Sequence, residues 1–148
     1  MLAFEPFDVS MLSIISICYL FYLSINQPPK IVAQCFFCFA LVLFSSGLHW
    51  LYISIHTVSG APIWLTILLI FLLSSLMALY YYLTGLLISK IYHASQSKSL
   101  ILLSIGPALW VLMEWARGWL LSGFPWFSVG YSQINTFLSN WAPIGGIY

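Results

Sequence analysis

Residues 106–133 read GPALWVLMEWARGWLLSGFPWFSVGYSQ, and the interpretation of the rest of the chain depends on this stretch. It holds Glu114 and Arg117, the only two opposite charges that lie close together inside an apolar run. A Gly-Phe-Pro-Trp corner, Gly123–Trp126, follows them. Ionisable residues within a membrane helix usually mark a functional site, because placing them in lipid is costly. The stretch therefore predicts a membrane-spanning helix that ends at a site.

The composition argues against a water-facing surface. Of the 148 residues, 62% are hydrophobic and 5% are charged, whereas soluble domains carry about 25% charged residues. The sequence therefore predicts an all-α fold, a polytopic membrane helix bundle whose surroundings are membrane lipid. A net charge of +1 without any basic cluster argues against nucleic acid as a partner.

Four apolar runs predict four complete transmembrane helices in a single membrane domain, residues 1–148. The predicted spans cover about residues 9–25, 31–55, 63–91 and 100–121. Residues 122–140 are expected to form a loop on the outer face, and an incomplete span is expected from about residue 141. The first residues have the character of a helix tail, so partial helices are predicted at both ends.

The lysines predict the orientation of the chain. Lys30, Lys90 and Lys98 all fall on one side of the predicted spans, and the two opposite loops carry no lysine. The positive-inside rule makes the lysine side cytoplasmic. The N-terminal turn, the turn at residues 49–62 and the Gly123–Trp126 corner then share the outer face, where they can meet and form a site.

The polar pair and the corner each have two interpretations. Glu114 and Arg117 are three residues apart, so they can pair directly on one helix face. The pair is either a polar patch that faces a headgroup cavity or a structural pair that fixes helix packing. The corner is either the aromatic-walled entrance of a cavity or a plain connecting loop, since non-helical backbone at membrane depth must be buried or line a cavity.

Other candidate chemistry finds little support in the sequence. His49 and His56 are seven residues apart, but a metal or haem site would need partner histidines on a facing helix. Cys35 and Cys38 have C-x-x-C spacing within an apolar run, and they are interpreted as small apolar core residues. We therefore predict no catalytic residue, no metal and no cofactor in this chain.

Several segments resemble the bacterial apolipoprotein N-acyltransferase family, in order and at the family's spacing. The matching segments are Leu2–Asp8, Gly47–Ile55, Pro107–Trp110, Glu114–Trp126, Gly130–Gln133 and Ala142–Gly145. The most specific block is Glu-x-x-Arg-Gly-Trp followed by Gly-Phe-Pro-Trp and Gly-Tyr-Ser-Gln. The resemblance covers essentially the whole chain.

The resemblance implies a bacterial inner-membrane enzyme, one that moves an acyl chain from a phospholipid to the α-amine of a diacylglyceryl-cysteine in a lipoprotein. Such enzymes carry a periplasmic nitrilase-like domain with a Glu-Lys-Cys triad, which has no counterpart here, so no catalytic residue is carried over. The resemblance does imply an outer-face lining that holds the acyl chains. It comprises Glu114, Arg117, Gly123, Phe124, Pro125, Trp126, Gly130, Tyr131 and Gln133, with His49 and Trp50 nearby.

Two functions follow as expectations. The first is a truncated or split membrane portion that holds phospholipid and lipoprotein acyl chains for a separately encoded nitrilase-like C-terminal portion. The second is a non-catalytic small membrane scaffold or transporter subunit. Whether the chain is an enzyme by itself stays open at this point.

Overall fold

The computed structural model describes residues 3–4, 7, 9–120 and 123–146, and its described part contains helices and turns but no strand. The all-α prediction is therefore confirmed. The long elements are α1 (Met11–Leu23), α2 (Pro29–Gly47), α3 (Ile63–Ala94) and α5 (Gly106–Arg117). The short ones are η1 (Leu48–Trp50), η2 (Ile53–Val58), α4 (Lys98–Leu100), η3 (Ile101–Ile105), η5 (Val129–Gln133), η6 (Phe137–Trp141) and α6 (Ala142–Gly145).

Three helical stretches in the described residues are long and apolar enough to cross a membrane. They are Pro29–Trp50 with 22 residues, Ile63–Ala94 with 32 and Lys98–Arg117 with 20. A span needs about 20 residues. Helix α1 has 13 residues and is about 20 Å long at 1.5 Å per residue. The chain is thus a membrane protein with three such helices, and the fourth span, expected over residues 9–25, stays a prediction.

Helices α2 and α3 form an antiparallel hairpin that carries the core. Phe36 and Phe44 of α2 are fully buried, as are Ala78 and, almost completely, Tyr81 of α3. Gly85 of α3 brings the two backbones close together, because its missing side chain leaves room for the Phe36 ring. Helix α5 packs its buried Trp110 onto this hairpin, with ring centroids 4.8 Å from Tyr81 and 6.0 Å from Phe36.

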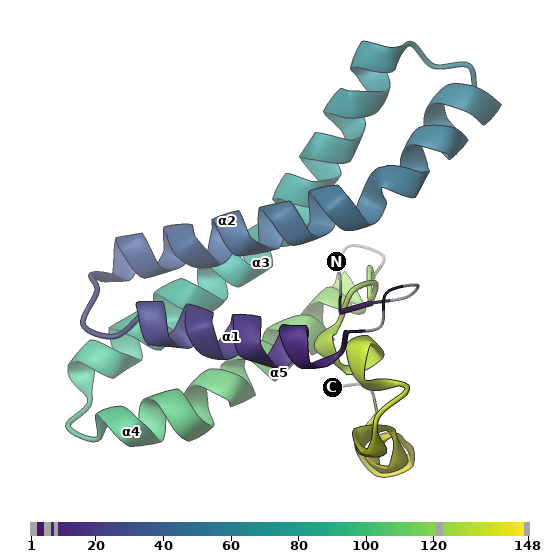
Figure 1. The fold of residues 1–148 in the computed structure, drawn as a ribbon. Helices are drawn as coiled ribbons and strands as arrows, with labels where there is room; N and C mark the ends of the chain where they lie inside the picture. The colour runs from purple at the N-terminus through teal and green to yellow at the C-terminus, as the bar shows by residue number, and fades with distance from the viewer. Residues whose placement is uncertain (1–2, 5–6, 8, 121–122, 147–148) are drawn as a thin grey trace.

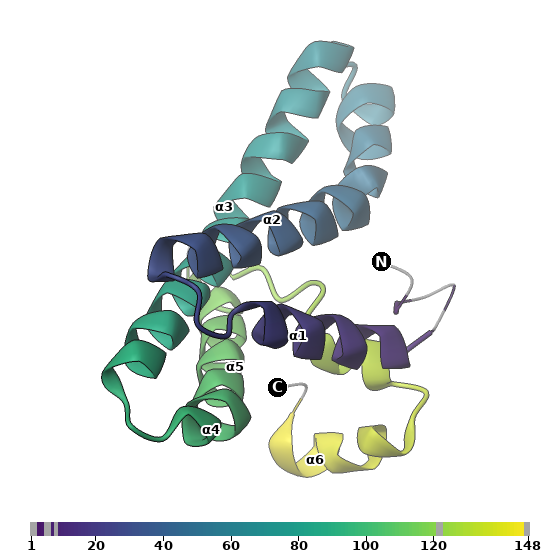
Figure 2. The ribbon, with the colours of Figure 1, turned by 60° about the vertical axis from the view of Figure 1, so that its left-hand side comes forward.

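The hairpin extends beyond the other helices. Figures 1 and 2 show the end of the α2 arm, with η2, and the beginning of α3 projecting away from α1 and α5. At 32 residues, α3 is about 48 Å long, which exceeds the roughly 30 Å of hydrocarbon in a bilayer. The tip of the hairpin therefore lies away from the Gly123–Trp126 corner. Of the turn expected at residues 49–62, only the first residues can reach that corner.

The α1–α2 loop, next to Lys30, and the α3–α4 loop, between Lys90 and Lys98, lie together at the end of the molecule opposite the tip of the hairpin (Figure 1). Asn26 accepts a hydrogen bond from the Tyr92 hydroxyl at 3.2 Å, and the Gln27 carbonyl is hydrogen-bonded by the His93 ring at 2.8 Å. The Lys98 ammonium lies 4.6 Å from the centroid of the Tyr92 ring. These contacts join the α1–α2 loop to the last residues of α3, next to the α3–α4 loop, while the side of the membrane on which they lie stays a prediction.

Replacing Gly85 with valine should separate α2 from α3. A Cβ atom at residue 85 would lie 2.8 Å from Cγ and 3.0 Å from Cβ of Phe36, too close for either helix to keep its position. Overpacking of this kind costs about 1–3 kcal/mol. Thermal unfolding in detergent, followed by circular dichroism, should show a lower Tm. Gly145→Val is the matched control, because no atom lies within 4 Å of a Cβ there; equal Tm values for the two variants would contradict the close contact.

Candidate functional site

Arg117, the last residue of α5, holds the Gly123–Trp126 corner in place. Its guanidinium donates from Nη1 to the carbonyls of Phe124 and Trp126, the latter at 2.7 Å, and from Nη2 to the Ser128 hydroxyl at 3.0 Å. The group is 1% exposed and lies 5.2 Å from the centroid of the Phe44 ring. One buried cation therefore fixes three acceptors of a non-helical segment to the end of a helix.

Glu114 lies one turn before Arg117 and holds the segment that follows the corner. Its Oε1 accepts from the Tyr81 hydroxyl at 3.1 Å and from the Val129 backbone N–H at 3.2 Å, and Oε2 lies 3.3 Å from the same N–H. None of these hydrogen bonds joins Glu114 to Arg117. The two charges share one buried face of α5, as predicted, but Arg117 is bound by the chain that follows the helix, whereas Glu114 is bound by that chain and by Tyr81 of α3.

The backbone takes a positive φ angle at the first residue of the corner and at the residue that directly follows it. Gly123 has φ +73° and Phe127 has φ +62°; this left-handed region is easy for glycine and unusual for phenylalanine. The Phe127 ring is held by its packing, 6.2 Å from Phe44 and 5.5 Å from Phe4 between ring centroids. It also covers Gly47, where a Cβ atom would lie 2.5 Å from the ring. The strained backbone of Phe127 is therefore held in place by the surrounding aromatic packing.

A second polar cluster fixes the beginning of α1 to η5. The Ser132 hydroxyl lies 2.8 Å from the Ser13 hydroxyl, and the Gln133 amide donates to the Ser10 carbonyl at 3.1 Å and to Ser13 Oγ at 3.0 Å. These three side chains are all at least nine-tenths buried. The cluster joins segments nearly 120 residues apart in the sequence, and thus brings the N-terminal region to the corner.

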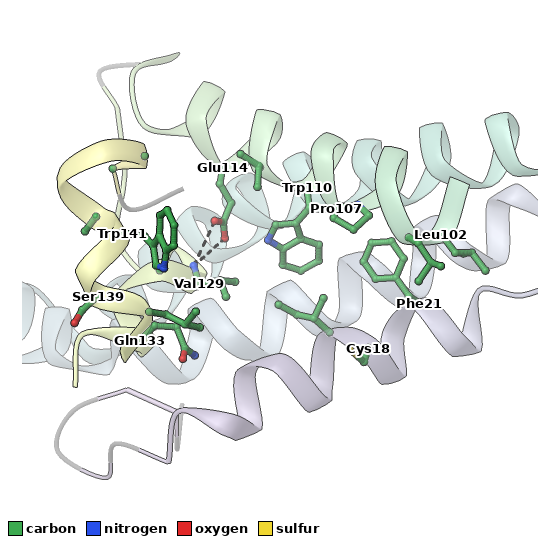
Figure 3. A pocket seen from close by; sticks show the side chains of 18 of the residues that line it. Cys18, Phe21, Leu102, Pro107, Trp110, Glu114, Val129, Gln133, Ser139 and Trp141 are labelled. Atoms are coloured by element: carbon green, nitrogen blue, oxygen red, sulfur yellow. Dashed lines mark hydrogen bonds between the residues drawn. The ribbon is translucent and has the colours of Figure 1, made fainter. Parts of the chain in front are cut away.

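A groove of about 710 Å³ runs between α1 and α5 and is closed at one side by η5, η6 and α6. Figure 3 shows the carboxylate of Glu114 and the indole of Trp110 on α5 facing Val129, Gln133 and Trp141 across it. Its remaining walls are mostly apolar, with Phe21, Leu102 and Pro107 among them. The volume falls within the range of about 300–1,000 Å³ that is typical of small-molecule sites.

A second groove, about 820 Å³, lies between α1 and α2. Leu12 and Ser16 of α1 and Phe39 and Val42 of α2 form its sides, and its floor includes Phe127. Three residues line both grooves. They are Ile17, Trp110 and Val129. Helix α1 is therefore a wall shared by two apolar grooves.

The structure brings most of the predicted lining together. Glu114, Arg117, Phe124 and Trp126 belong to one hydrogen-bonded unit, and the Trp50 ring lies 5.9 Å from that of Trp126. Gly130 and Gln133 line the first groove, and the Pro125 carbonyl accepts from Ser128 Oγ at 2.9 Å. The first residues of the 49–62 turn and the N-terminal Phe4 thus meet the corner, as expected.

Other predicted residues lie differently. His49 is exposed, and its ring is hydrogen-bonded to the carbonyl of Ser46 near the end of α2, at 2.9 Å. Tyr131 is exposed too, with its backbone N–H bonded to Ser128. The interpretation of the cysteines as core residues is wrong for Cys38, which is exposed on the helix surface, and Cys35 is only partly buried.

The sequence analysis missed three residues that complete the site. Tyr81 supplies a hydroxyl to Glu114 from the middle of α3, Ser128 is the side-chain partner of Arg117, and Phe127 covers Gly47. Of the three, only the role of Ser128 could have been predicted, because a buried arginine needs acceptors and Ser128 lies 11 residues after Arg117 in the sequence. Tyr81 depends on a contact 33 residues away in the sequence, which no local pattern indicates.

The arrangement is suited to holding an amphiphile. A carboxylate and an indole lie at one part of a mostly apolar groove. Among the described residues no three His, Cys, Asp or Glu side chains are grouped so that they could hold a metal ion. What the chain offers chemically is a place for an apolar tail beside a small polar recognition point.

Comparisons with known proteins give a consistent result. The profile of the family described as "Apolipoprotein N-acyltransferase N-terminal domain" matches residues 1–148. Proteins named apolipoprotein N-acyltransferase from Vibrio cholerae and Vibrio parahaemolyticus are 38% and 37% identical over 147 residues, and one from Pseudomonas syringae is 34% identical over 148 residues. The alignments cover 99% of this chain but only 28–29% of each relative.

Arg117→Ala should release the corner while leaving the α2–α3 hairpin folded. Hydrogen bonds to charged groups contribute about 1.5–3 kcal/mol each, and this substitution removes three of them. Hydrogen–deuterium exchange in detergent should rise strongly in residues 123–133 and stay unchanged in α3. Trp115→Ala is the control, since Trp115 is on the exposed face of the same helix. Unchanged exchange at the corner would refute the role given to Arg117.

Proposed function

The chain belongs to the apolipoprotein N-acyltransferase family, as its N-terminal domain, and from this premise we propose that it forms the lipid-holding membrane part of such an enzyme. Acyl chains of the phospholipid donor and of the lipoprotein acceptor lie against its apolar grooves. The chain spans less than a third of the length of the curated relatives that it matches, so the acyl transfer itself is assigned to the portion that those relatives carry beyond the match.

The observation that carries the proposal is the position of the groove between α1 and α5 relative to the corner. Glu114 lines the groove and also accepts a hydrogen bond from the backbone N–H of Val129, three residues after the corner ends at Trp126. Arg117, at the last residue of α5, holds the same corner through its carbonyls. An acyl chain in the groove would thus end beside a fixed, aromatic-rimmed segment, where a catalytic portion could reach it.

We place the protein in the bacterial inner membrane with several spans. The loops near Lys30, Lys90 and Lys98 then face the cytoplasm, and the Gly123–Trp126 corner faces the periplasm. The clustering of the two lysine-flanked loops at one end of the molecule supports this orientation (Figure 1). A separately encoded nitrilase-like portion then docks at the opposite end, which carries the corner.

Complementation tests the proposal. The chain is expressed in bacteria depleted of their own N-acyltransferase, alone and together with the part of the Vibrio cholerae relative that follows the matched region. Mass spectrometry then measures N-acylation of a reporter lipoprotein. We expect N-acylation only when both parts are present, because the grooves and the catalytic portion lie on different chains.

Two variants sharpen the test. Arg117→Ala should reduce N-acylation at least tenfold, since the corner loses its fixed position, whereas Trp115→Ala on the exposed face should retain it. N-acylation by this chain alone would contradict the assignment of catalysis to the portion that the relatives carry beyond the match. If both parts reach the membrane and no N-acylation follows, the proposal fails and a scaffold role takes its place.

A further inference from the structure

We propose that Phe127 is a latch between the corner and α2. In the closed state, which the structure shows, its ring covers Gly47; in the open state the ring leaves Gly47 and the backbone of residue 127 relaxes from its left-handed conformation. Opening the latch lengthens the groove between α1 and α2. The latch is a conformational device of the fold, and it does not depend on what the grooves hold.

The ring of Phe127 occupies a space that only a glycine leaves open. A Cβ atom at residue 47 would lie 2.5 Å from Cζ of the ring, and the two next nearest atoms, at 2.7 Å and 2.8 Å, belong to the same ring. Gly47 is the last residue of α2, and its φ of −74° is one that any residue adopts. The position therefore needs a glycine because of the Phe127 ring, and not because of the backbone of α2.

Backbone strain opposes the closed state, and aromatic contacts favour it. Phe127 has φ +62°, which is strained for a bulky residue. Its ring makes edge contacts with Phe44 and Phe4, at 6.2 Å and 5.5 Å between ring centroids, and such contacts contribute free energies of the same order as the strain. Burying the ring adds little in a membrane, because lipid is apolar too. The closed state is therefore favoured by a small margin, and the open state is within reach.

Two anchors on α5 leave residue 127 as the movable joint of this segment. Arg117 donates to the Trp126 carbonyl at 2.7 Å, and Glu114 accepts from the Val129 N–H at 3.2 Å. The chain is thus fixed to one helix on both sides of Phe127. Across the part of the chain that the structure describes, no hydrogen bond involves the backbone of Phe127 itself. The ring can therefore swing away without breaking a hydrogen bond of its own residue.

The latch controls the size of the groove between α1 and α2. Phe127 forms part of the floor of this groove, and the space next to Gly47 lies directly under the ring. In the open state this space joins the groove, which then extends further toward the end of α2. An apolar occupant that reaches the added space binds only the open state, and so shifts the latch toward it.

Nuclear magnetic resonance of the full chain in detergent micelles tests the latch. A phenylalanine that carries one ¹³C atom at Cζ is placed at residue 127 by cell-free synthesis, so that the label adds no atom to the ring. We expect two resonances, a major one displaced by the ring currents of Phe44 and Phe4 and a minor one near the position of free phenylalanine. Gly47→Ala should raise the ratio of the second to the first about tenfold, because the added Cβ excludes the ring and overpacking has a cost of this size.

Gly145→Ala is the matched control, since no atom lies within 4 Å of a Cβ at that residue. The ratio of the two resonances should stay unchanged in this variant. A resonance pattern that is the same in the unaltered chain and in a folded Gly47→Ala variant would overturn the latch.

A second pair of variants keeps the latch falsifiable if Gly47→Ala fails to fold. Phe4→Ala removes one of the two ring contacts that hold the latch closed, whereas Phe7→Ala removes a nearby ring that is exposed. The open fraction should rise about threefold in Phe4→Ala, the effect of losing one aromatic pair, and stay unchanged in Phe7→Ala. Equal resonance patterns in these two variants would also overturn the latch.

The latch can fail separately from the proposed function. N-acylation in the complementation test, together with a resonance pattern that Gly47→Ala leaves unchanged, would refute the latch alone. Two resonances that respond to Gly47→Ala, without N-acylation in the complementation test, would support the latch and refute the proposed function alone.

Discussion

The site depends on the hydrogen bonds that the Arg117 guanidinium donates to the chain beyond its own helix. The backbone from Gly123 to Phe127 has a left-handed residue at each end and is not helical. The carbonyls of Phe124 and Trp126 therefore need donors other than those of a regular helix. In lipid, unsatisfied carbonyls are expensive, since no water replaces the missing donors. Placing a cation at the last residue of α5 supplies these donors, and the corner can then close over Gly47 and position the aromatic rings that surround it.

The same arrangement explains how two opposite charges are accommodated in an apolar helix without a direct ion pair. A charged side chain near the bilayer centre costs about 2.5–3.5 kcal/mol on insertion scales. Here Glu114 is stabilised by a hydroxyl from α3 and a backbone N–H beyond the corner, and Arg117 by a carbonyl pair and a hydroxyl. The sequence left open a structural pair and a patch facing a cavity, and the two residues differ in this respect. Arg117 is structural, and Glu114 faces the groove.

Much of this could be read from the sequence, and the exceptions have physical causes. The apolar runs, the shared face of Glu114 and Arg117, and the meeting of Phe4, Trp50 and the corner follow from hydropathy, helical periodicity and loop sidedness. The continuation of the α2 arm through η2 was not predictable, because a charge-free stretch gives no signal for where a helix leaves lipid. Tyr81 and Phe127 act through contacts between distant segments, which no local pattern indicates. The His49 ring is hydrogen-bonded to the nearby Ser46 carbonyl.

Helix α1 separates the two grooves, and this has a mechanical consequence. Its firm polar attachments are the Ser13–Gln133 cluster near its beginning and the Asn26 and Gln27 bonds just after its end. Between these attachments, movement of α1 toward α5 would narrow one groove and widen the other by the same displacement. Ligands in the two grooves would therefore compete through the position of a single helix, and a bulky occupant on one side would oppose binding on the other without touching it.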